Sequence, residues 1–182
     1  TLFWQHGYEA TSLSDLVEAT GAKAPTLYAE FTNKEGLFRA VLDRYISRFA
    51  AKHEAQLFCE EKTVEQALQD YFCAVATCFT SKDTPAGCFM INTSATLAAS
   101  SKEIANTVKS RHAMQEETLS TFLAQRQQRG EIPAHCRPQE LAQYLSCILQ
   151  GMSISAREGA TLEKLQGITQ ITLRLWPELL KL

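Results

Sequence analysis

Residues 11–37 read TSLSDLVEATGAKAPTLYAEFTNKEGL, and this stretch decides the fold. Thr11 and Ser12 are residue types that cap the start of a helix. Asp15 follows Ser12 by three residues, which is the spacing of a capping box. The glycine at position 21 permits the left-handed backbone with which helices often end. We therefore expect a short helix that begins after Ser12 and ends at this glycine.

A second short helix is expected directly after this turn. Pro25 has no backbone N–H, so only the first turn of a helix accommodates it, and the helix should run from about Ala24 to Phe31. Two short helices joined by a tight turn with a glycine are typical of the helix-turn-helix, whose second helix enters the major groove of DNA. Spacing alone does not decide this, since any small helical bundle contains such a pair. The apolar residues expected to anchor the pair are Leu13, Leu16, Val17 and Leu27.

A longer third helix should link two modules. Thr32 or Asn33 caps it, with Glu35 placed to complete a capping box from Thr32. Its apolar residues recur at helical spacing from Leu37 to Phe49, so the helix is expected to continue to about Lys52. We divide the chain accordingly into a module with the helix-turn-helix pattern, residues 1–50, and a second helical module, residues 51–182.

The rest of the chain is also predicted to be helical, which makes the fold class all-α. Apolar residues recur at helical spacing nearly everywhere, and no run of β-branched residues alternates with polar ones. At the start of the chain, Leu2 and Phe3 should belong to a helix that Gly7 closes. The further expected helices are 64–79, 88–99, 102–129, 139–157 and 162–176, with loops at 80–87 and 130–138.

Composition excludes several classes of protein. The 182 residues are 45% hydrophobic and 21% charged, with 8 Gly and 5 Pro, which is unlike collagen-like, low-complexity or disordered chains. A net charge of −2 gives no electrostatic footprint of nucleic-acid binding. Because we find neither a signal-peptide pattern nor a continuous apolar span, we expect no membrane association and a cytoplasmic location. The chain begins at Thr1 within an expected helix, so we expect an upstream segment to be missing.

The cysteines and histidines predict neither a metal site nor an enzyme. None of the six cysteines forms Cys-x-x-Cys, and the four histidines have no ligand spacing with them, so no metal or cofactor is expected. We interpret the thiols as reduced and mostly buried. The alternative is a regulator switched by oxidation of Cys73, Cys78 or Cys88. A thiol-dependent enzyme is a remote alternative, because no nucleophile context surrounds any histidine.

One longer pattern runs through the first fifty residues. It reads Phe3-x-x-x-Gly7-Tyr8-x-x-Thr11-Ser12 and then Gly21-x-x-x-Pro25-Thr26-Leu27-Tyr28-x-x-Phe31-x-Asn33-Lys34-Glu35-x-Leu37. This pattern resembles the DNA-binding region of TetR-type transcriptional regulators. Three further segments are similar to one subset of that family's effector domains: Gly87-Cys88-Phe89-Met90, Gln150-Gly151-Met152 and Ala156–Ala160. The resemblance implies a dimeric repressor that binds a palindromic operator in double-stranded DNA and is released by a small-molecule effector.

The resemblance also implies which residues bind DNA. Helix N-termini attract phosphate, and phosphate contacts set the register while base contacts set the sequence preference. The implied phosphate contacts are Thr11, Ser12, Tyr28 and Lys34, and the residues implied to face base edges are Lys23, Ala24 and Thr26. Alternatively, Tyr28 is a core aromatic, Thr26 a plain surface residue and Lys34 a solvated charge. A helical adaptor that binds no DNA is a further alternative.

An effector pocket and a dimer interface complete the expectation. The expected pocket lining is Tyr71, Phe72, Val75, Phe89, Met90, Met114, Phe122 and Gln150, although such an apolar stripe is more often core. Two stripes on the last two helices are expected to pair with a second copy in a four-helix contact, although either helix could face its own core. These stripes are Leu141, Tyr144, Leu145, Ile148, Leu149 and Met152, and then Leu165, Ile168, Thr172 and Leu175.

Overall fold

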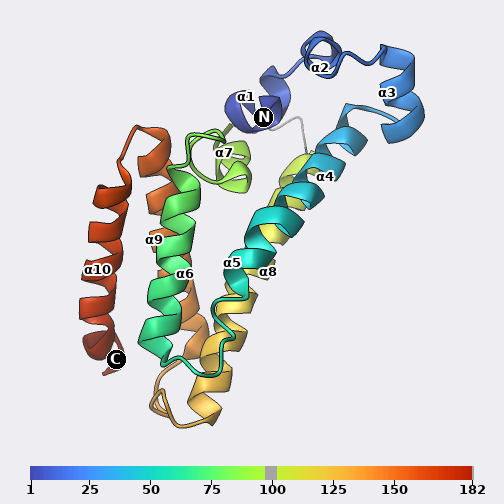
Figure 1. Cartoon of the computed structure of the whole chain (residues 1–182). Coiled ribbons are helices and arrows are strands. Elements are labelled where there is room, and N and C mark those ends of the chain that lie inside the picture. Colours follow the sequence, from blue (N-terminus) through green and yellow to red (C-terminus); the bar gives the residue numbers. More distant parts are fainter. Residues whose placement is uncertain (97–101, 182) are drawn as a thin grey trace.

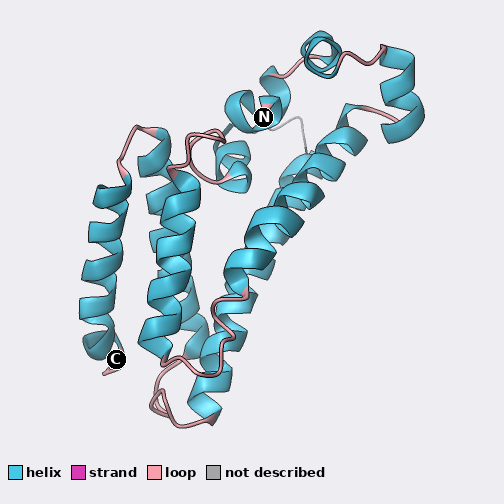
Figure 2. Ribbon diagram, viewed as in Figure 1, coloured by secondary structure: helices cyan, strands magenta, loops and turns pink. Residues whose placement is uncertain are grey.

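The computed structural model describes residues 1–96 and 102–181, and every regular element within these ranges is a helix (Figures 1 and 2). The prediction of an all-α chain is confirmed. In order, the helices are α1 (Leu2–Ala10), α2 (Leu13–Thr20), α3 (Ala24–Phe31), α4 (Lys34–Tyr45), the π-helix η1 (Ile46–Ala50), α5 (Ala51–Glu54), α6 (Val64–Phe79), α7 (Phe89–Thr96), α8 (Lys102–Gln128), α9 (Pro138–Arg157) and α10 (Leu162–Leu179). The expected end of the helix after Cys88, at Ala99, lies outside the described residues.

Local capping signals set the start and end of α2. The Ser12 hydroxyl accepts a hydrogen bond from the Asp15 backbone N–H at 3.1 Å, and the Asp15 carboxylate accepts one from the Ser12 N–H at 2.7 Å. Gly21 ends the helix with a φ of 67°, a conformation that costs glycine little. The predicted capping box and the predicted helix stop are both present.

The start of α4 differs in detail from the prediction. The Asn33 side chain caps the helix by accepting a hydrogen bond from the Gly36 N–H at 2.8 Å. Thr32 instead has a φ of 66° and lies outside the helix, so the expected box between Thr32 and Glu35 is wrong. Glu35 forms an ion pair with Arg39, one turn along the helix, at 2.6 Å.

The linking helix is continuous but not uniform. The segments α4, η1 and α5 follow one another without a break from Lys34 to Glu54, close to the predicted end (Figure 1). The middle segment, η1, is a π-helix of five residues. Single π-turns inside α-helices are rare and frequently occur at functional sites. The wider turn lies between the N-terminal helices and the long helices of the remainder of the chain.

The long helices form a bundle, and α2 and α3 lie at one end of the molecule, away from it (Figure 1). In the bundle, α8 packs along α9, and α6 packs against α10 and α9. The N-terminal helices are joined to the bundle through α7, which packs against both α1 and α4. Trp4, Tyr45 and Phe89 form the centre of this junction, with ring centroids 5.0–6.0 Å apart. No described helix has the length and apolar character that crossing a membrane requires.

Candidate nucleic-acid interface and effector cavity

The crossing of α2 and α3 is held by buried side chains and a tight turn. Leu16 of α2 and Leu27 of α3 are both buried. The Thr20 hydroxyl donates to the Leu16 carbonyl at 2.7 Å and accepts from the Ala22 N–H at 3.3 Å, which fixes the turn between the helices. These contacts give α3 a defined direction at the exposed end of the molecule.

The outward face of α3 carries polar and aromatic side chains. Lys23, at the N-cap, and Thr26 are exposed, while Ala24 beside them is half-buried. Tyr28 is 41% exposed, so the alternative that it is a core aromatic is wrong. An exposed tyrosine beside an exposed lysine and threonine provides donors, acceptors and a ring on one short helix. Such a surface is suited to contact with phosphates and base edges.

Two residues expected to bind phosphate make contacts within the chain. Thr11 is fully buried, and its hydroxyl donates to the Gly7 carbonyl at 2.7 Å, so the expectation of a phosphate contact from this hydroxyl is wrong. Lys34 is half-buried: its Nζ donates to the Glu9 carbonyl at 3.4 Å and lies 4.4 Å from the centroid of the Tyr8 ring. Burial lowers the pKa of the Lys34 ammonium group.

Lys34 therefore ties the start of α4 to the end of α1, which a freely solvated charge would not do. Ser12 remains exposed at the N-terminus of α2, although its hydroxyl already caps the helix.

A cavity of about 510 Å³ lies between the π-turn, the segment after it and the middle of α8. Its volume is within the range of small-molecule sites. Its lining consists of Ile46, Glu54, Phe58, Met90, Arg111, Met114, Gln115, Glu117, Thr118 and Thr121. Only two of the eight residues expected to form a pocket, Met90 and Met114, line it.

The other expected pocket residues lie elsewhere. The core contains Phe72, Phe89 and Phe122. A separate void of about 30 Å³ next to the cavity is bordered by Tyr71 and Val75. Gln150 is exposed on α9, so its assignment to the pocket is wrong. Glu54, Phe58 and Arg111 line the cavity but were not predicted from the sequence. No spacing rule could have found the last of these, because it meets its partner 68 positions away.

Charged and polar groups surround the apolar part of this cavity. The Arg111 guanidinium donates to the Asp43 carboxylate of α4 at 2.6 Å, so an ion pair joins α8 to the linking helix. Glu54 is half-buried, and this burial raises the pKa of its carboxyl group. The Gln115 side-chain amide donates to the Tyr71 hydroxyl at 3.3 Å behind the cavity wall.

The expected dimer stripes are only partly at the surface. Leu145, Leu149 and Met152 of α9 are buried within the chain itself because they face α6 and α8. The same correction holds for Leu141, Leu165 and Thr172. Of the expected residues, Tyr144, Ile148 and Ile168 are half-buried and Leu175 is exposed.

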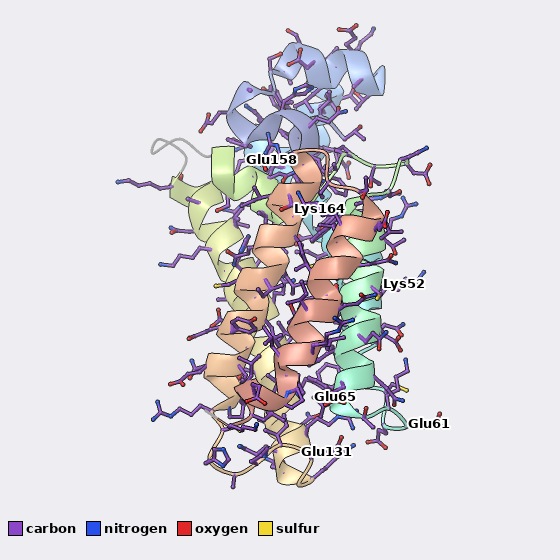
Figure 3. All side chains as sticks on the ribbon, turned by 90° about the vertical axis from the view of Figure 1, so that its left-hand side faces the viewer. Lys52, Glu61, Glu65, Glu131, Glu158 and Lys164 are labelled. Carbon is purple, nitrogen blue, oxygen red and sulfur yellow. The ribbon has the colours of Figure 1, made fainter. Side chains whose placement is uncertain are left out.

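Exposed apolar side chains lie on the same two helices. Ile154 of α9 and Ile171 of α10 are both largely exposed, as is Leu175. These helices form the face turned to the viewer in Figure 3, where Glu158 and Lys164 mark the end nearest to the N-terminal helices. Large apolar side chains are therefore exposed on both α9 and α10.

The three thiols named for an oxidation switch differ in exposure, since Cys88 is buried and Cys73 and Cys78 are half-buried. Cys88 receives a hydrogen bond from the Tyr45 hydroxyl at 3.3 Å, and its N–H donates to the Ser153 hydroxyl at 2.7 Å. Burial raises the pKa of Cys88 and of Cys73, and raises the pKa of Cys78 to about 11. The thiolate is the reactive form of cysteine, so a raised pKa lowers the share of that form at neutral pH. The described residues also contain no cluster of three metal-ligating side chains.

Comparison with protein families gives two matches. Residues 1–41 match the model "Bacterial regulatory proteins, tetR family", and residues 64–169 match "Tetracyclin repressor-like, C-terminal domain". Together the two matches cover most of the chain.

Individual relatives agree with these matches. The HTH-type transcriptional repressor ComR of Escherichia coli (strain K12) is 79% identical over 180 residues, which is 99% of this chain and 86% of that protein. The HTH-type transcriptional repressor BdcR of the same organism is 29% identical, over 90% of this chain and 78% of that protein. Among solved structures, a cysteine mutant of the TetR family regulator CifR, complexed with double-strand operator DNA, superposes with a TM-score of 0.91 at 26% identity, covering 97% of this chain and 92% of that one.

Proposed function

The chain belongs to the tetR family of bacterial regulatory proteins, and from this we propose that it is a transcriptional repressor that binds a duplex operator through α2 and α3. It is a DNA-binding regulator by family and not an enzyme. The observation that carries the proposal is the exposure of α3, where Thr26 and Tyr28 of the helix and Lys23 at its N-cap are all exposed. The names of its relatives support it, because ComR is a repressor and CifR is complexed with operator DNA.

The proposed operator complex contains two copies of the chain. A single short recognition helix reads only a few base pairs, so two copies spaced by about 34 Å, one turn of DNA, read a pseudo-palindrome. The exposed apolar residues Ile154, Ile171 and Leu175 on the outer face of α9 and α10 support an interface there. Gly151, exposed on α9, allows close approach of a facing helix.

Release of DNA is proposed to follow from a ligand in the 510 Å³ cavity. Arg111, in the cavity wall, is bonded to Asp43 of the helix that continues from the DNA-binding end. A ligand that binds better when this pair and the π-turn are rearranged shifts the population toward a conformation in which the two α3 helices no longer fit successive grooves. The required differential affinity is several kcal/mol.

The test is selection of bound duplexes from a random pool, followed by anisotropy titrations with the selected duplex. We expect Tyr28→Ala to weaken binding at least tenfold. Gln69→Ala is the control, because Gln69 is exposed on α6, away from α2 and α3, and does not line the cavity. Equal binding by both variants would contradict a DNA contact at Tyr28, and no enrichment of any duplex would contradict the proposal and favour a helical adaptor.

A further inference from the structure

The cavity beside the π-turn has an apolar body that is incompletely covered. Its apolar lining side chains are Ile46, Phe58, Met90 and Met114. Phe58 and Met114 are among the most exposed large hydrophobic side chains in the described part of the chain. Burial of such side chains against a ligand is favourable, and methionine adapts to irregular shapes. The site is therefore suited to a bulky apolar ligand.

The charges around this body are unbalanced toward negative. Arg111 is already neutralised by Asp43, with 2.6 Å between the nitrogen and the carboxylate oxygen. Glu54 and Glu117 also line the cavity, and neither forms an ion pair with another of the described residues. One paired cation and two unpaired carboxylates give the cavity a net attraction for positive charge.

Glu54 is the inner of these two carboxylates. It borders both the 510 Å³ cavity and the adjoining 30 Å³ void, whereas Glu117 lies exposed at the rim. Its burial is not compensated by its neighbour His53, because burial and Lys52 both lower the pKa of that imidazole and favour its neutral form. A half-buried carboxylate without a partner carries a desolvation cost that a bound cation would remove.

We propose that the effector is an amphipathic organic cation, whose apolar groups lie against Phe58, Met90 and Met114 and whose positive charge pairs with Glu54. The proposal rests on the proposed function of this cavity as the effector site. The Phe58 ring adds an aromatic face on which a cation is favourable. An anionic effector would have to draw Arg111 away from Asp43, and it would meet two repelling carboxylates.

The experiment uses two probes of nearly equal shape and opposite charge. Tetraphenylphosphonium and tetraphenylborate are titrated into the full chain by calorimetry in the absence of DNA. We expect tetraphenylphosphonium to bind at least tenfold more tightly than tetraphenylborate, and this preference to weaken as salt concentration rises.

Three variants locate the charge that binds the cation. Glu54→Gln keeps the shape of the side chain and is expected to weaken tetraphenylphosphonium binding at least tenfold, while tetraphenylborate binding stays the same or improves. Glu61→Gln is the matched control, because Glu61 is exposed in the loop before α6, near the end of the molecule opposite to α2 and α3 (Figure 3). Phe58→Ala, at an exposed position, is expected to weaken both probes. It keeps the test valid if Glu54→Gln does not fold.

Several outcomes would overturn the proposal. These are equal affinity for the two probes, tighter binding of tetraphenylborate, an unchanged affinity for tetraphenylphosphonium in Glu54→Gln, or no binding of either probe at millimolar concentration. Operator binding is measured separately. A chain that binds its selected duplex but fails these tests remains a repressor with another class of effector, whereas a chain that binds no duplex fails the proposed function itself.

Discussion

Thr26 and Tyr28 lie two residues apart on α3, and both are exposed, yet they are expected to read different parts of a duplex. Thr26→Ala removes a hydroxyl placed to face base edges, so it should change the preference among sequences more than the affinity for random DNA. Tyr28→Ala would remove the proposed phosphate contact and should weaken all duplexes alike, with a smaller salt slope. Anisotropy titrations against the selected duplex and a scrambled one measure both effects. Equal losses on the two duplexes for Thr26→Ala would exclude a role in base readout.

His112 of α8 gives a prediction on pH. Burial lowers the pKa of its imidazole from the usual 6.5, so the folded chain binds fewer protons at this site than the unfolded chain when the pH falls below that value. This contribution to the free energy of unfolding is full above pH 6.5 and is lost as the pH decreases. Wild-type protein should therefore lose stability relative to His112→Gln between pH 7.5 and 5.5, as measured by urea denaturation. A constant difference between the two proteins would contradict the shift.

Thr11 shows why site residues are harder to predict than helices. The sequence correctly placed it next to a helix N-terminus, but its hydroxyl is bonded to the Gly7 carbonyl and is buried. A helix cap and a buried hydrogen bond to a backbone carbonyl use the same residue types, since both depend on a short side chain with a hydroxyl. Only the packing of α1 against the rest of the chain distinguishes the two.

At the scale of elements, the loop before α7 depends on one glycine. Gly87 has a φ of 78°, and a Cβ there would lie 2.7 Å from the Ser153 carbonyl oxygen of α9. Gly130 has the same φ, but nothing lies within 4 Å of a Cβ at that position. Gly130→Ala should cost about 1–2 kcal/mol through backbone strain alone. Gly87→Ala should lower the free energy of unfolding by a further amount of about 1–3 kcal/mol, because its Cβ would also overpack the contact with α9. Urea denaturation of both variants measures the difference, and equal losses would show that α9 yields at this contact.

Helices could be predicted from the sequence because their ends are encoded locally. The Ser12–Asp15 box, the glycine at position 21 and the amphipathic stripes each act within a few residues. Which helix packs against which apolar stripe depends on residues far apart in the sequence. Leu145 and Leu149 were assigned to a dimer because periodicity reports an apolar face but not its neighbour, and α6 and α8 occupy that face. Most of the predicted cavity lining was wrong for the same reason.

At the scale of the whole molecule, six large hydrophobic side chains are exposed among the described residues, and all six lie at three proposed sites. Tyr28 is on α3, Phe58 and Met114 line the cavity, and Ile154, Ile171 and Leu175 are on the outer face of α9 and α10. Large apolar surfaces left uncovered in a chain mark sites of interaction. The distribution supports one DNA contact, one ligand contact and one protein contact.

The protein contact is tested at its most exposed residue. Ile171→Asp places a charge in the centre of the proposed interface, where its desolvation is costly, and should convert a dimer to a monomer in sedimentation equilibrium. Gln69→Glu adds the same charge to an exposed position on α6 and should leave the mass unchanged. A dimer that survives Ile171→Asp would place the interface elsewhere.

Coupling between the cavity and DNA is tested at the ion pair between α4 and α8. Asp43→Asn breaks the bond to Arg111, and exposed pairs of this kind contribute about 0.2–1 kcal/mol. We expect the ratio of operator affinities without and with tetraphenylphosphonium to change by up to about fivefold. Glu35→Gln breaks an ion pair within α4 and removes the same charge, so it is the control. An identical change in both variants would show that the effect is one of net charge.

The π-turn at Ile46–Ala50 has a consequence for the length of the chain. A π-turn accommodates one residue more than regular α-helix needs over the same distance, so removing one residue there leaves the flanking turns in phase. Deletion of the exposed Ser47 should thus yield an uninterrupted α-helix and a cooperatively folding protein. The same deletion two turns earlier would rotate Phe38 by about 100° away from the interior. The segment Ile46–Ala50 is thus a place in the connecting helix where the chain can lose one residue and keep its fold.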